Sequence, residues 1–430
     1  MNQSLNRRAL LSAGLLAGVG AQASPSHATT APEPPFDPAD WASVRAQFVL
    51  PRDTADLAAF VLARHPAPVR KAIRAHRDRL DADPHYYPEP DPDLAARTAA
   101  ARLLGGRPED VALTDSTTMG LGVLYGGLRL RPGQEVLTTE HDFLATHEAL
   151  RLRTERDGAT ARRIRLYDDP ATASVEQITA RLRRALRPRT RVVAVTWVHS
   201  STGVRLPIRE MASVVAEANR GRAEADRALL CVDAVHGFGA VAAGVGELGC
   251  DFLATGTHKW LFGPRGTGIL WGRRWDAVVP LITSFGQVSF DHFFFGSSEH
   301  PIDGAYHTPG GYKAFEHRWA LDRAFSFIGA IGMDRVHARI QALAARLKSG
   351  LAELRHVRLA TPASPALSAG LVCLSIDGMQ PIEAVGRLRL EHRIIASTTP
   401  YRESLLRFGT TILNTPEEVD KAIRAVAALA

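Results

Sequence analysis

The sequence contains few cysteines, and none of the spacings at which cysteine and histidine bind zinc. Three cysteines occur in 430 residues, and Cys231, Cys250 and Cys373 each lie within an apolar, strand-like run. There is no Cys-x-x-Cys pair and no His-Glu-x-x-His segment. Metal binding therefore has no support, and we expect the three thiols to be inert residues of the core.

Signatures of several other protein classes are also absent. No Gly-x-Ser-x-Gly segment indicates a hydrolase, and no Walker lysine follows a glycine-rich turn. The formal net charge is +7, or 7 − 2 = +5 without Arg7 and Arg8. That charge is modest, and the arginine-rich stretches lack the interleaved aromatic residues on which bases stack. We expect no nucleic-acid partner.

The N-terminus lacks an apolar run long enough to anchor the chain in a membrane, which takes about 20 residues. Instead, Arg7 and Arg8 precede a short stretch rich in Ala, Gly and Leu, and small residues follow. This pattern predicts a twin-arginine (Tat) signal peptide over residues 1–28, cleaved near Ala23 or Ala28. We therefore expect the Tat export machinery as a partner, a periplasmic location and no stable membrane anchor. A Sec signal or a disordered tail stays as the alternative, because Leu10 replaces the preferred Phe.

Short Val/Leu/Ile runs alternate with amphipathic stretches over most of the chain, which is typical of an α/β protein with a mainly parallel sheet. The strand candidates are Val111–Leu113, Glu135–Thr138, Ala161–Leu166, Val192–Thr196, Leu229–Val232, Phe252–Ala254 and Thr267–Leu270. From about Gly311 a long helical stretch precedes short strands and a final helix, which indicates a smaller α+β domain. The predicted division is an N-terminal arm over 29–60, a large domain over 61–305 and a small domain over 306–430.

Lys259 follows the end of one of these predicted strands. It lies between His258 and Trp260 and is followed by glycines that expose the backbone. A lysine at such a position is a candidate for a depressed pKa and for Schiff-base formation. An ordinary exposed loop lysine is the alternative interpretation.

Asp233 ends the preceding predicted strand, and His236 lies three residues later. A carboxylate at the end of a buried strand needs a cationic partner, and the pyridinium nitrogen of pyridoxal 5′-phosphate (PLP) is one. His236 could then reach the phenolic oxygen of the same ring. Alternatively, Asp233 caps a helix and His236 packs in the core.

Hydroxyl residues connect another predicted strand to an apolar helix. Ser116, Thr117 and Thr118 stand where free N–H groups and the helix dipole favour a phosphate. An ordinary Ser/Thr N-cap is the competing explanation.

Taken in order along the chain, these segments resemble the class V family of PLP-dependent aminotransferases, which includes cysteine desulfurases, kynureninases and isopenicillin N epimerases. The epimerase branch is the most similar in its Thr-Thr-Met-Gly turn, its His-Lys-Trp trio and its Asn-Thr-x-Glu-Glu-Val-Asp ending. The resemblance implies the PLP-dependent transferase fold type I, with a mainly parallel seven-stranded sheet between helices and a smaller α+β C-terminal domain.

The resemblance also implies roles for individual residues. Lys259 would form the Schiff base, His141 would stack on the cofactor ring, and Asp233 would pair with its nitrogen. Further contacts to PLP would come from Ser116, Thr117, Thr118, Ser200, His236, Thr257 and His258, with Thr308 reaching the partner's phosphate across a homodimer. Arg407 would bind a substrate carboxylate. Where the family often has a serine three residues before the lysine, this chain has Gly256.

The implied function is that of an exported PLP enzyme acting on an amino acid or a peptide-like amine, with transamination favoured. Epimerisation, C–S or C–N lysis, and a non-catalytic binding protein are the alternatives. Cysteine desulfuration is disfavoured because residues 395–402 contain no cysteine. The aromatic stretch 290–296 would line a substrate entrance or form a dimer contact.

Overall fold

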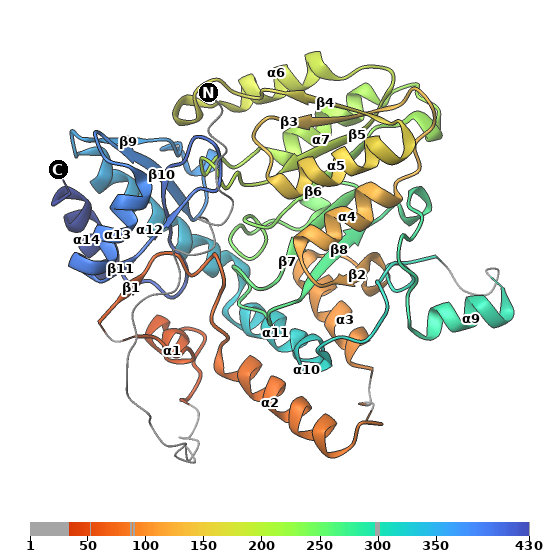
Figure 1. The fold of residues 1–430 in the computed structure, drawn as a ribbon, viewed down its shortest axis with the longest axis horizontal. Helices are drawn as coiled ribbons and strands as arrows, with labels where there is room; N and C mark the ends of the chain where they lie inside the picture. The colour runs from red at the N-terminus through yellow and green to blue at the C-terminus, as the bar shows by residue number, and fades with distance from the viewer. Residues whose placement is uncertain (1–33, 52, 87, 89–90, 297–301, 430) are drawn as a thin grey trace, which may run out of the picture. The chain divides into compact units, whose positions relative to one another are not determined.

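A seven-stranded sheet forms the centre of the protein (Figure 1). The structure is a computed structural model that describes residues 34–51, 53–86, 88, 91–296 and 302–429. The predicted signal peptide and the beginning of the predicted arm lie outside these residues.

The strands of this sheet match the seven predicted ones in number and place. They are β2 (Val111–Thr114), β3 (Glu135–Thr139), β4 (Thr160–Ile164), β5 (Thr190–Thr196), β6 (Leu229–Asp233), β7 (Phe252–Gly256) and β8 (Gly268–Gly272). Their spatial order is β2-β8-β7-β6-β5-β3-β4, and only β8 runs antiparallel to its neighbours. The predicted mainly parallel sheet, and with it the predicted fold class, is confirmed.

Helices cover both faces of the sheet, which explains why its strands are almost continuously apolar. Every residue of β5 is buried. Val193 and Val195 contribute to one core, whereas Val192 and Ala194 contribute to another on the opposite face. Because side chains alternate along a strand, an apolar residue at every position serves both cores.

We call the part of the chain built around the seven-stranded sheet the large lobe, and the C-terminal part the small lobe. The helices of the large lobe are α2 (Ala67–Ala82), α3 (Pro92–Leu104), α4 (Thr117–Gly127), α5 (Leu144–Asp157), α6 (Val175–Ala185), α7 (Ile208–Ala218), α8 (Val245–Leu248), α9 (Gln287–Phe295), α10 (Phe315–Trp319) and α11 (Leu321–Ile331). The remaining helices are α1 (Trp41–Ala46), α12 (Met333–Ala352), α13 (Pro381–His392) and α14 (Pro416–Ala427). Helix α12 joins the two lobes: Val336 and Ile340 pack in the core of the large sheet, and Leu343 and Leu347 pack in the core of the small one.

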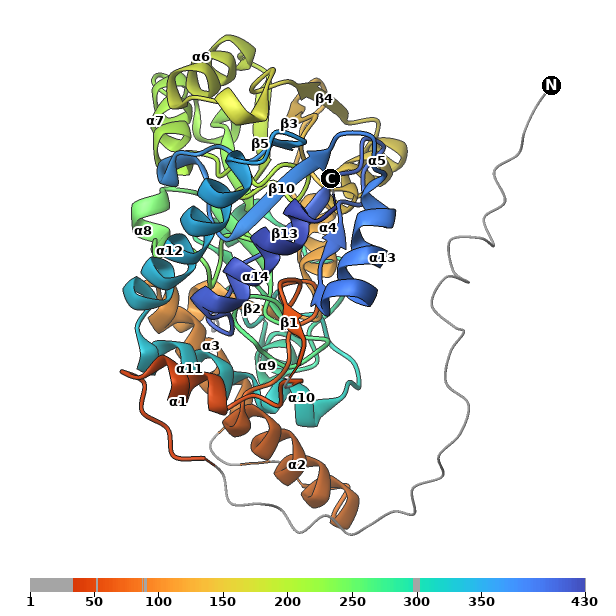
Figure 2. The same ribbon diagram turned by 90° about the vertical axis from the view of Figure 1, so that its left-hand side faces the viewer.

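A four-stranded antiparallel sheet organises the C-terminal part of the chain (Figure 2). Its strands, in spatial order, are β12 (Ser397–Thr398), β13 (Leu406–Gly409), β10 (Leu371–Ile376) and β9 (Val357–Leu359). Beside it, β1 (Ala55–Asp56) pairs in parallel with β11 (Ile394–Ile395). Residues of the predicted N-terminal arm are therefore part of the small lobe.

The three cysteines are buried and unpaired, as predicted for core residues. Burial raises the pKa of the Cys250 and Cys373 thiols to about 12. Within the described ranges, no helix is long and apolar enough to cross a membrane, and no cluster of His, Cys, Asp and Glu could hold a metal ion.

The final helix starts with a capping box that offers a test of the fold's energetics. Thr415 Oγ1 accepts a hydrogen bond from the Glu418 N–H, and the Glu418 carboxylate accepts one from the Thr415 N–H, each at 3.2 Å. Replacing Thr415 by Ala should lower the free energy of unfolding by about 1 kcal/mol, measured as a lower midpoint of guanidinium denaturation. Thr415→Ser keeps the accepting oxygen and should stay near the wild-type midpoint. Equal midpoints for the two variants would contradict the assignment.

Candidate active site

A cavity of about 310 Å³ lies where the parallel strands end. The carboxyl ends of β5, β6 and β7 lead into its lining residues, as expected for ligand sites of parallel sheets. Nine of the residues predicted to bind cofactor or substrate line it: Ser116, Thr117, Thr118, Ser200, Asp233, His236, His258, Lys259 and Arg407. An apolar wall completes it with Val61, Phe143, Ala145, Val235 and Pro400. The fold thus brings together residues that are nearly 300 positions apart in the sequence, since 407 − 116 = 291.

Lys259 lies on a tight loop after β7. The Gly263 N–H closes the loop on the Thr257 carbonyl at 2.9 Å, and Phe262 adopts a left-handed φ of 57° that is unusual for a bulky residue. The Lys259 amino group makes no hydrogen bond or ion pair with any described residue. Burial, with a smaller contribution from Arg407, lowers the pKa of this amine to about 8. A neutral, nucleophilic amine is therefore accessible near neutral pH.

Asp233 ends β6 with one oxygen bound and the other free. Oδ1 accepts the Val235 N–H at 3.0 Å, whereas Oδ2 is buried and has no partner among the described residues. Burial raises the pKa of the carboxyl to about 7. Asp233 therefore caps the following turn, as the alternative interpretation predicted, but with one of its two oxygens only. An orphaned acceptor of this kind fits a ligand that brings a cationic N–H, such as the protonated pyridine nitrogen of PLP.

His236 is held in one tautomer. Its Nδ1 accepts a hydrogen bond from the Trp260 indole N–H at 3.1 Å, and an indole nitrogen can only donate. Burial lowers the pKa of His236 well below its ordinary value, so the ring is neutral. Its proton is therefore on Nε2, where it can be donated to an oxygen in the cavity.

The turn before α4 holds hydroxyl groups whose protons are available to an anion. Ser116 Oγ accepts the Met119 N–H at 3.1 Å, so it is an N-cap, as the competing explanation required. Thr117 Oγ1 accepts the Gly256 N–H at 2.6 Å. Each hydroxyl can still donate its own proton, and both line the cavity at the helix N-terminus. Capping and phosphate binding are therefore compatible here.

Gly256 stands where the family that this sequence resembles often has a serine, and the surrounding side chains leave no room for one. A Cβ at this position would lie 2.8 Å from His258 Cε1 and 3.2 Å from Thr117 Oγ1. The space that a serine would take is occupied by the imidazole of His258, whose Nδ1 is buried without a partner in the described chain. His258 is thus available for the contact that the serine makes elsewhere.

Arg407, on β13, brings an uncompensated positive charge into the cavity. Its Nη1 donates to the Ser200 carbonyl at 3.1 Å and its Nε donates to Ser397 Oγ at 3.2 Å. The side chain is largely buried, and none of the acidic residues in the described part of the chain forms an ion pair with it. A buried guanidinium without a carboxylate is a site for an anionic ligand.

His141 and Thr257 do not line the cavity. His141 stacks on Tyr167 with 3.9 Å between ring centroids and 10° between planes. Its predicted stacking on the cofactor ring stays a prediction. Burial lowers the pKa of His141 to about 3, and the ring is neutral. The Thr257 hydroxyl is turned into its own loop, 2.5 Å from Thr267 Oγ1.

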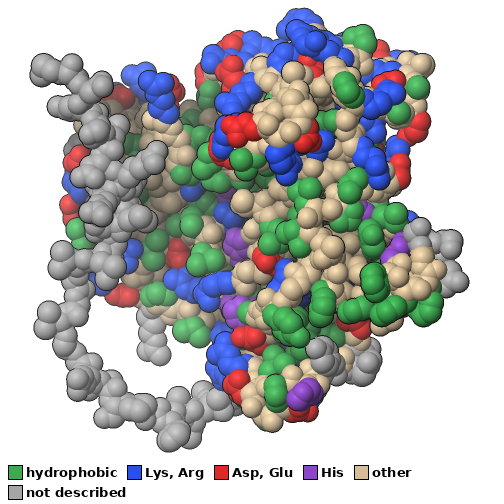
Figure 3. Space-filling model, turned by 45° about the vertical axis from the view of Figure 1, so that its right-hand side comes forward, with side chains coloured by type: hydrophobic (Ala, Val, Ile, Leu, Met, Phe, Trp, Pro, Cys, Tyr) green, Lys and Arg blue, Asp and Glu red, His purple; other side chains and the backbone are tan. Residues whose placement is uncertain are grey.

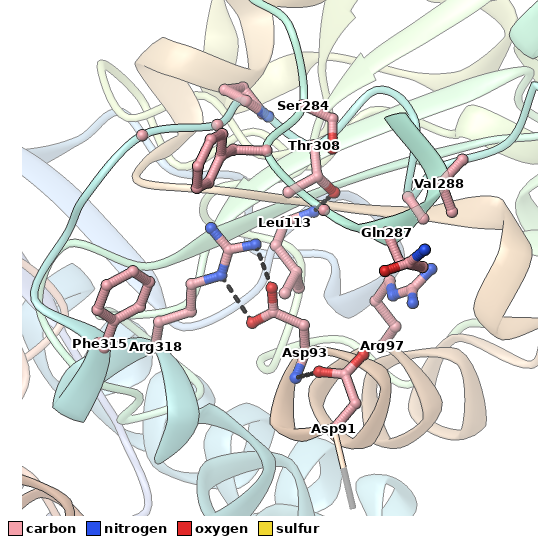
Figure 4. Close-up of a pocket in the computed structure, with 16 residues that line it drawn as sticks. Asp91, Asp93, Arg97, Leu113, Ser284, Gln287, Val288, Thr308, Phe315 and Arg318 are labelled. Atoms are coloured by element: carbon pink, nitrogen blue, oxygen red, sulfur yellow. Dashed lines mark hydrogen bonds and ion pairs between the residues drawn. The ribbon is translucent and has the colours of Figure 1, made fainter. Parts of the chain in front are cut away.

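Thr308 lies in a different cavity, of about 150 Å³ (Figure 4). Its hydroxyl accepts the Leu113 N–H and donates to the Gly304 carbonyl, both at 3.0 Å. Arg318 pairs with both carboxylate oxygens of Asp93 in the same cavity. Thr308 therefore does not contact the Lys259 cavity of its own chain, and its predicted contact across a dimer stays a prediction.

Some residues in and beside the cavity are not predicted from the sequence. Val61 and Phe143 line it, and Phe143 lies two residues after His141. The Tyr401 hydroxyl lies 2.7 Å from Oγ of the lining residue Ser200. None of these positions carries a motif. Phe143 and Tyr401 lie near His141 and Arg407 in the sequence, whereas no sequence signal marks Val61.

The chain is similar in sequence and in fold to known proteins. Residues 94–421 match the family model described as aminotransferase class V. The chain is 26% identical over 406 residues to the isopenicillin N epimerase of Streptomyces clavuligerus, an alignment covering 91% of this chain and 98% of the relative. It is 26% identical over 438 residues to a probable cysteine desulfurase of Xylella fastidiosa, covering 92% and 97%. A solved structure of a cystine C–S lyase with its product cysteine persulfide shares the fold, with a TM-score of 0.76 at 21% identity, covering 87% of this chain and 98% of that one.

The lowered pKa of Lys259 predicts how attachment of PLP to the apoprotein depends on pH. The amine is the nucleophile only when neutral, so the rate of attachment should rise through pH about 8 and level off above it. The measurement is mass spectrometry of peptides after borohydride reduction at a series of pH values. Lys348 is a matched control, because burial also lowers its pKa to about 8 but its amino group donates to two carbonyls and to Ser368 Oγ. Label on Lys348, or a rate that keeps rising to pH 10, would contradict the assignment.

Proposed function

Because the chain belongs to the class V aminotransferase family, we propose that it is an exported aminotransferase acting on an amino acid or on a peptide-like compound that carries one. The family membership makes it a PLP-dependent enzyme. Epimerisation and C–S or C–N lysis are the alternatives; an epimerase and a C–S lyase are named among its relatives and structural neighbours. A non-catalytic binding protein is disfavoured because the cavity retains its lysine, aspartate and arginine together.

One observation carries the proposal. Three groups in a single cavity lack the partner that their chemistry requires: the Lys259 amine, Asp233 Oδ2 and the Arg407 guanidinium. When bound, PLP supplies an aldehyde that captures amines and a ring that accepts electrons from the α-carbon. The aldehyde of PLP would complement the Lys259 amine, and its ring nitrogen would complement Asp233 Oδ2. The carboxylate of the substrate would complement the Arg407 guanidinium.

Each lining residue would have its own role in binding. Ser116, Thr117 and His258 would hold the phosphate by donated protons at the N-terminus of α4. The neutral His236 would donate from Nε2 to the phenolic oxygen, and Asp233 Oδ2 would accept from the protonated ring nitrogen. Arg407 would bind the α-carboxylate and so fix the α-carbon relative to Lys259.

The distribution of bases favours transamination over epimerisation. Among the described lining residues, Lys259 supplies the only amine, and its amino group has no hydrogen bond or ion pair with a described residue, so it is suited to take a proton from the α-carbon and return it at a neighbouring atom. Epimerisation also needs an acid or base on the opposite face of the ring. His236 is fixed by the hydrogen bond from Trp260, and His258, which follows β7, is assigned above to the phosphate. A single proton carrier is sufficient for transamination.

The apolar wall indicates which amino donors the cavity takes. Val61, Phe143 and Pro400 line it, and its charged or titratable lining groups are all assigned above to PLP or to the carboxylate. No described lining group is left to neutralise a charged side chain. We therefore expect donors with uncharged side chains.

The absorbance spectrum of the purified protein and its response to a donor test this function. We expect absorbance near ~420 nm that borohydride abolishes, and its conversion toward ~330 nm by a neutral amino acid with release of the 2-oxo acid. Lys259→Ala should show neither change. Inversion of the amino acid without any 2-oxo acid would instead establish the epimerase, and a wild-type chain that cannot be loaded with PLP would refute the proposal.

Export rests on the N-terminal arginine pair, and it can be tested separately. Lys keeps the charge of Arg but not its planar fork, so the double substitution Arg7→Lys and Arg8→Lys should leave the full-length protein in the cytoplasm. Leu10→Phe restores the preferred residue and should be exported at least as well as the wild type. Periplasmic recovery of the double variant, measured by fractionation and blotting, would point to the Sec route.

A further inference from the structure

A short N-terminal segment, residues 57–63, connects two parts of the site. It forms hydrogen bonds both to β13, which carries Arg407, and to the loop that carries Lys259. The Leu57 carbonyl accepts the Gly409 N–H at 2.7 Å, two residues after Arg407. The Ala63 N–H donates to the His258 carbonyl at 2.9 Å, next to Lys259. The segment therefore holds these parts of the chain together by main-chain hydrogen bonds.

Phe60 lies in the middle of this segment, fully buried. The Cζ atom of Arg407 lies 5.0 Å from the centroid of its ring. The ring also stacks on Trp260 at 5.7 Å with 19° between planes, and it meets His236 edge-on at 5.8 Å. Phe60 thus touches the arginine assigned to the carboxylate, the histidine assigned to the phenolic oxygen and the tryptophan that fixes that histidine.

The backbone opposite Phe60 is adapted to the ring. A Cβ on Gly409 would lie 2.1 Å from the Phe60 ring, so the strand can approach the ring only at a glycine. The ring has no room to turn away from Arg407 on this side. Its position is therefore set by packing and does not depend on a bound ligand.

An aromatic ring suits this position better than an acid would. Arg407 carries five N–H donors, and its hydrogen bonds to Ser200 and Ser397 use two of them. A neighbouring carboxylate would take up the remaining donors and compete with the substrate. The π face of Phe60 attracts the cation without accepting those hydrogen bonds, so the fork stays oriented and available.

From these contacts we propose that Phe60 is a positioning residue that orients Arg407 and thereby sets the affinity of the cavity for a substrate carboxylate. The inference rests on the function proposed above and extends the site to the N-terminal segment. Phe60 itself touches neither the cavity surface nor the reacting atoms; it acts through Arg407.

The test is binding of propionate, which has a carboxylate but no amine, to the PLP-loaded enzyme by isothermal titration calorimetry. Phe60→Leu and Phe60→Met both remove the π face, and Met keeps most of the volume in case Leu destabilises the fold. Each should weaken propionate binding about fivefold to tenfold, from the strength of a buried cation–π contact. In turnover, KM for the amino acid should rise while kcat changes little, and KM for isopropylamine, which lacks the carboxylate, should not change. Phe60→Tyr keeps the π face and should restore propionate binding.

Phe327→Leu is the matched control. Phe327 is also buried and packs on two aromatic rings, Phe36 at 5.1 Å and Phe48 at 5.7 Å, but none of the three lines the cavity. It should bind propionate like the wild type. The inference is overturned if Phe60→Leu and Phe60→Met bind propionate with wild-type affinity, or if Phe327→Leu weakens binding equally. A wild-type chain that binds no PLP would refute the proposed function instead, so the two failures are distinguishable.

Discussion

The rest of the structure depends on one constraint: three ionisable groups must be held in one buried cavity without pairing with one another. Lys259, Asp233 and Arg407 all line the same space, yet none pairs with another by hydrogen bond or ion pair within the described chain. Burying unpaired ionisable groups opposes folding, and it shifts the pKa of Lys259 and of Asp233 toward neutrality. The two-sided cores of the large sheet fix the strand ends after which Asp233 and Lys259 lie, and the core of the small sheet fixes β13, which carries Arg407.

The strand ends are fixed relative to one another by a buried polar link as well as by apolar packing. Asp142, which follows His141, is buried; its Oδ1 accepts the Thr196 N–H at 2.7 Å, and its Oδ2 accepts the Thr139 N–H at 2.8 Å. One carboxylate thus ties the end of β3 to the end of β5. Its charge also contributes to the raised pKa of Asp233, after burial. A structural residue therefore influences the chemistry of its neighbour through the field it creates.

The surface around α9 stands apart from this polar site. Figure 3 shows apolar side chains gathered on that face of the molecule, and Phe285, Phe293, Phe294 and Phe295 are among the exposed residues. Exposed aromatic residues in such a cluster are unusual on a monomer and typical of a contact with another molecule. A substrate entrance and a dimer contact are the two roles predicted for the stretch 290–296, and both stay predictions.

The amino-acid sequence by itself determined the strand order along the chain, the residues that follow each strand and their chemical types. Apolar runs and glycine-rich turns are local, so β2 to β8 could be predicted, and Ser116, Asp233 and Lys259 could be placed after their ends. The tertiary structure decided which of these residues meet. It left His141, Thr257 and Thr308 outside the lining of the cavity, with the Thr257 hydroxyl bonded to Thr267 and the Thr308 hydroxyl bonded to Leu113 and Gly304. It also placed Val61 in the lining and Phe60 outside it, against Arg407. Proximity between positions 60 and 407 depends on packing between lobes, which no local pattern of residues records.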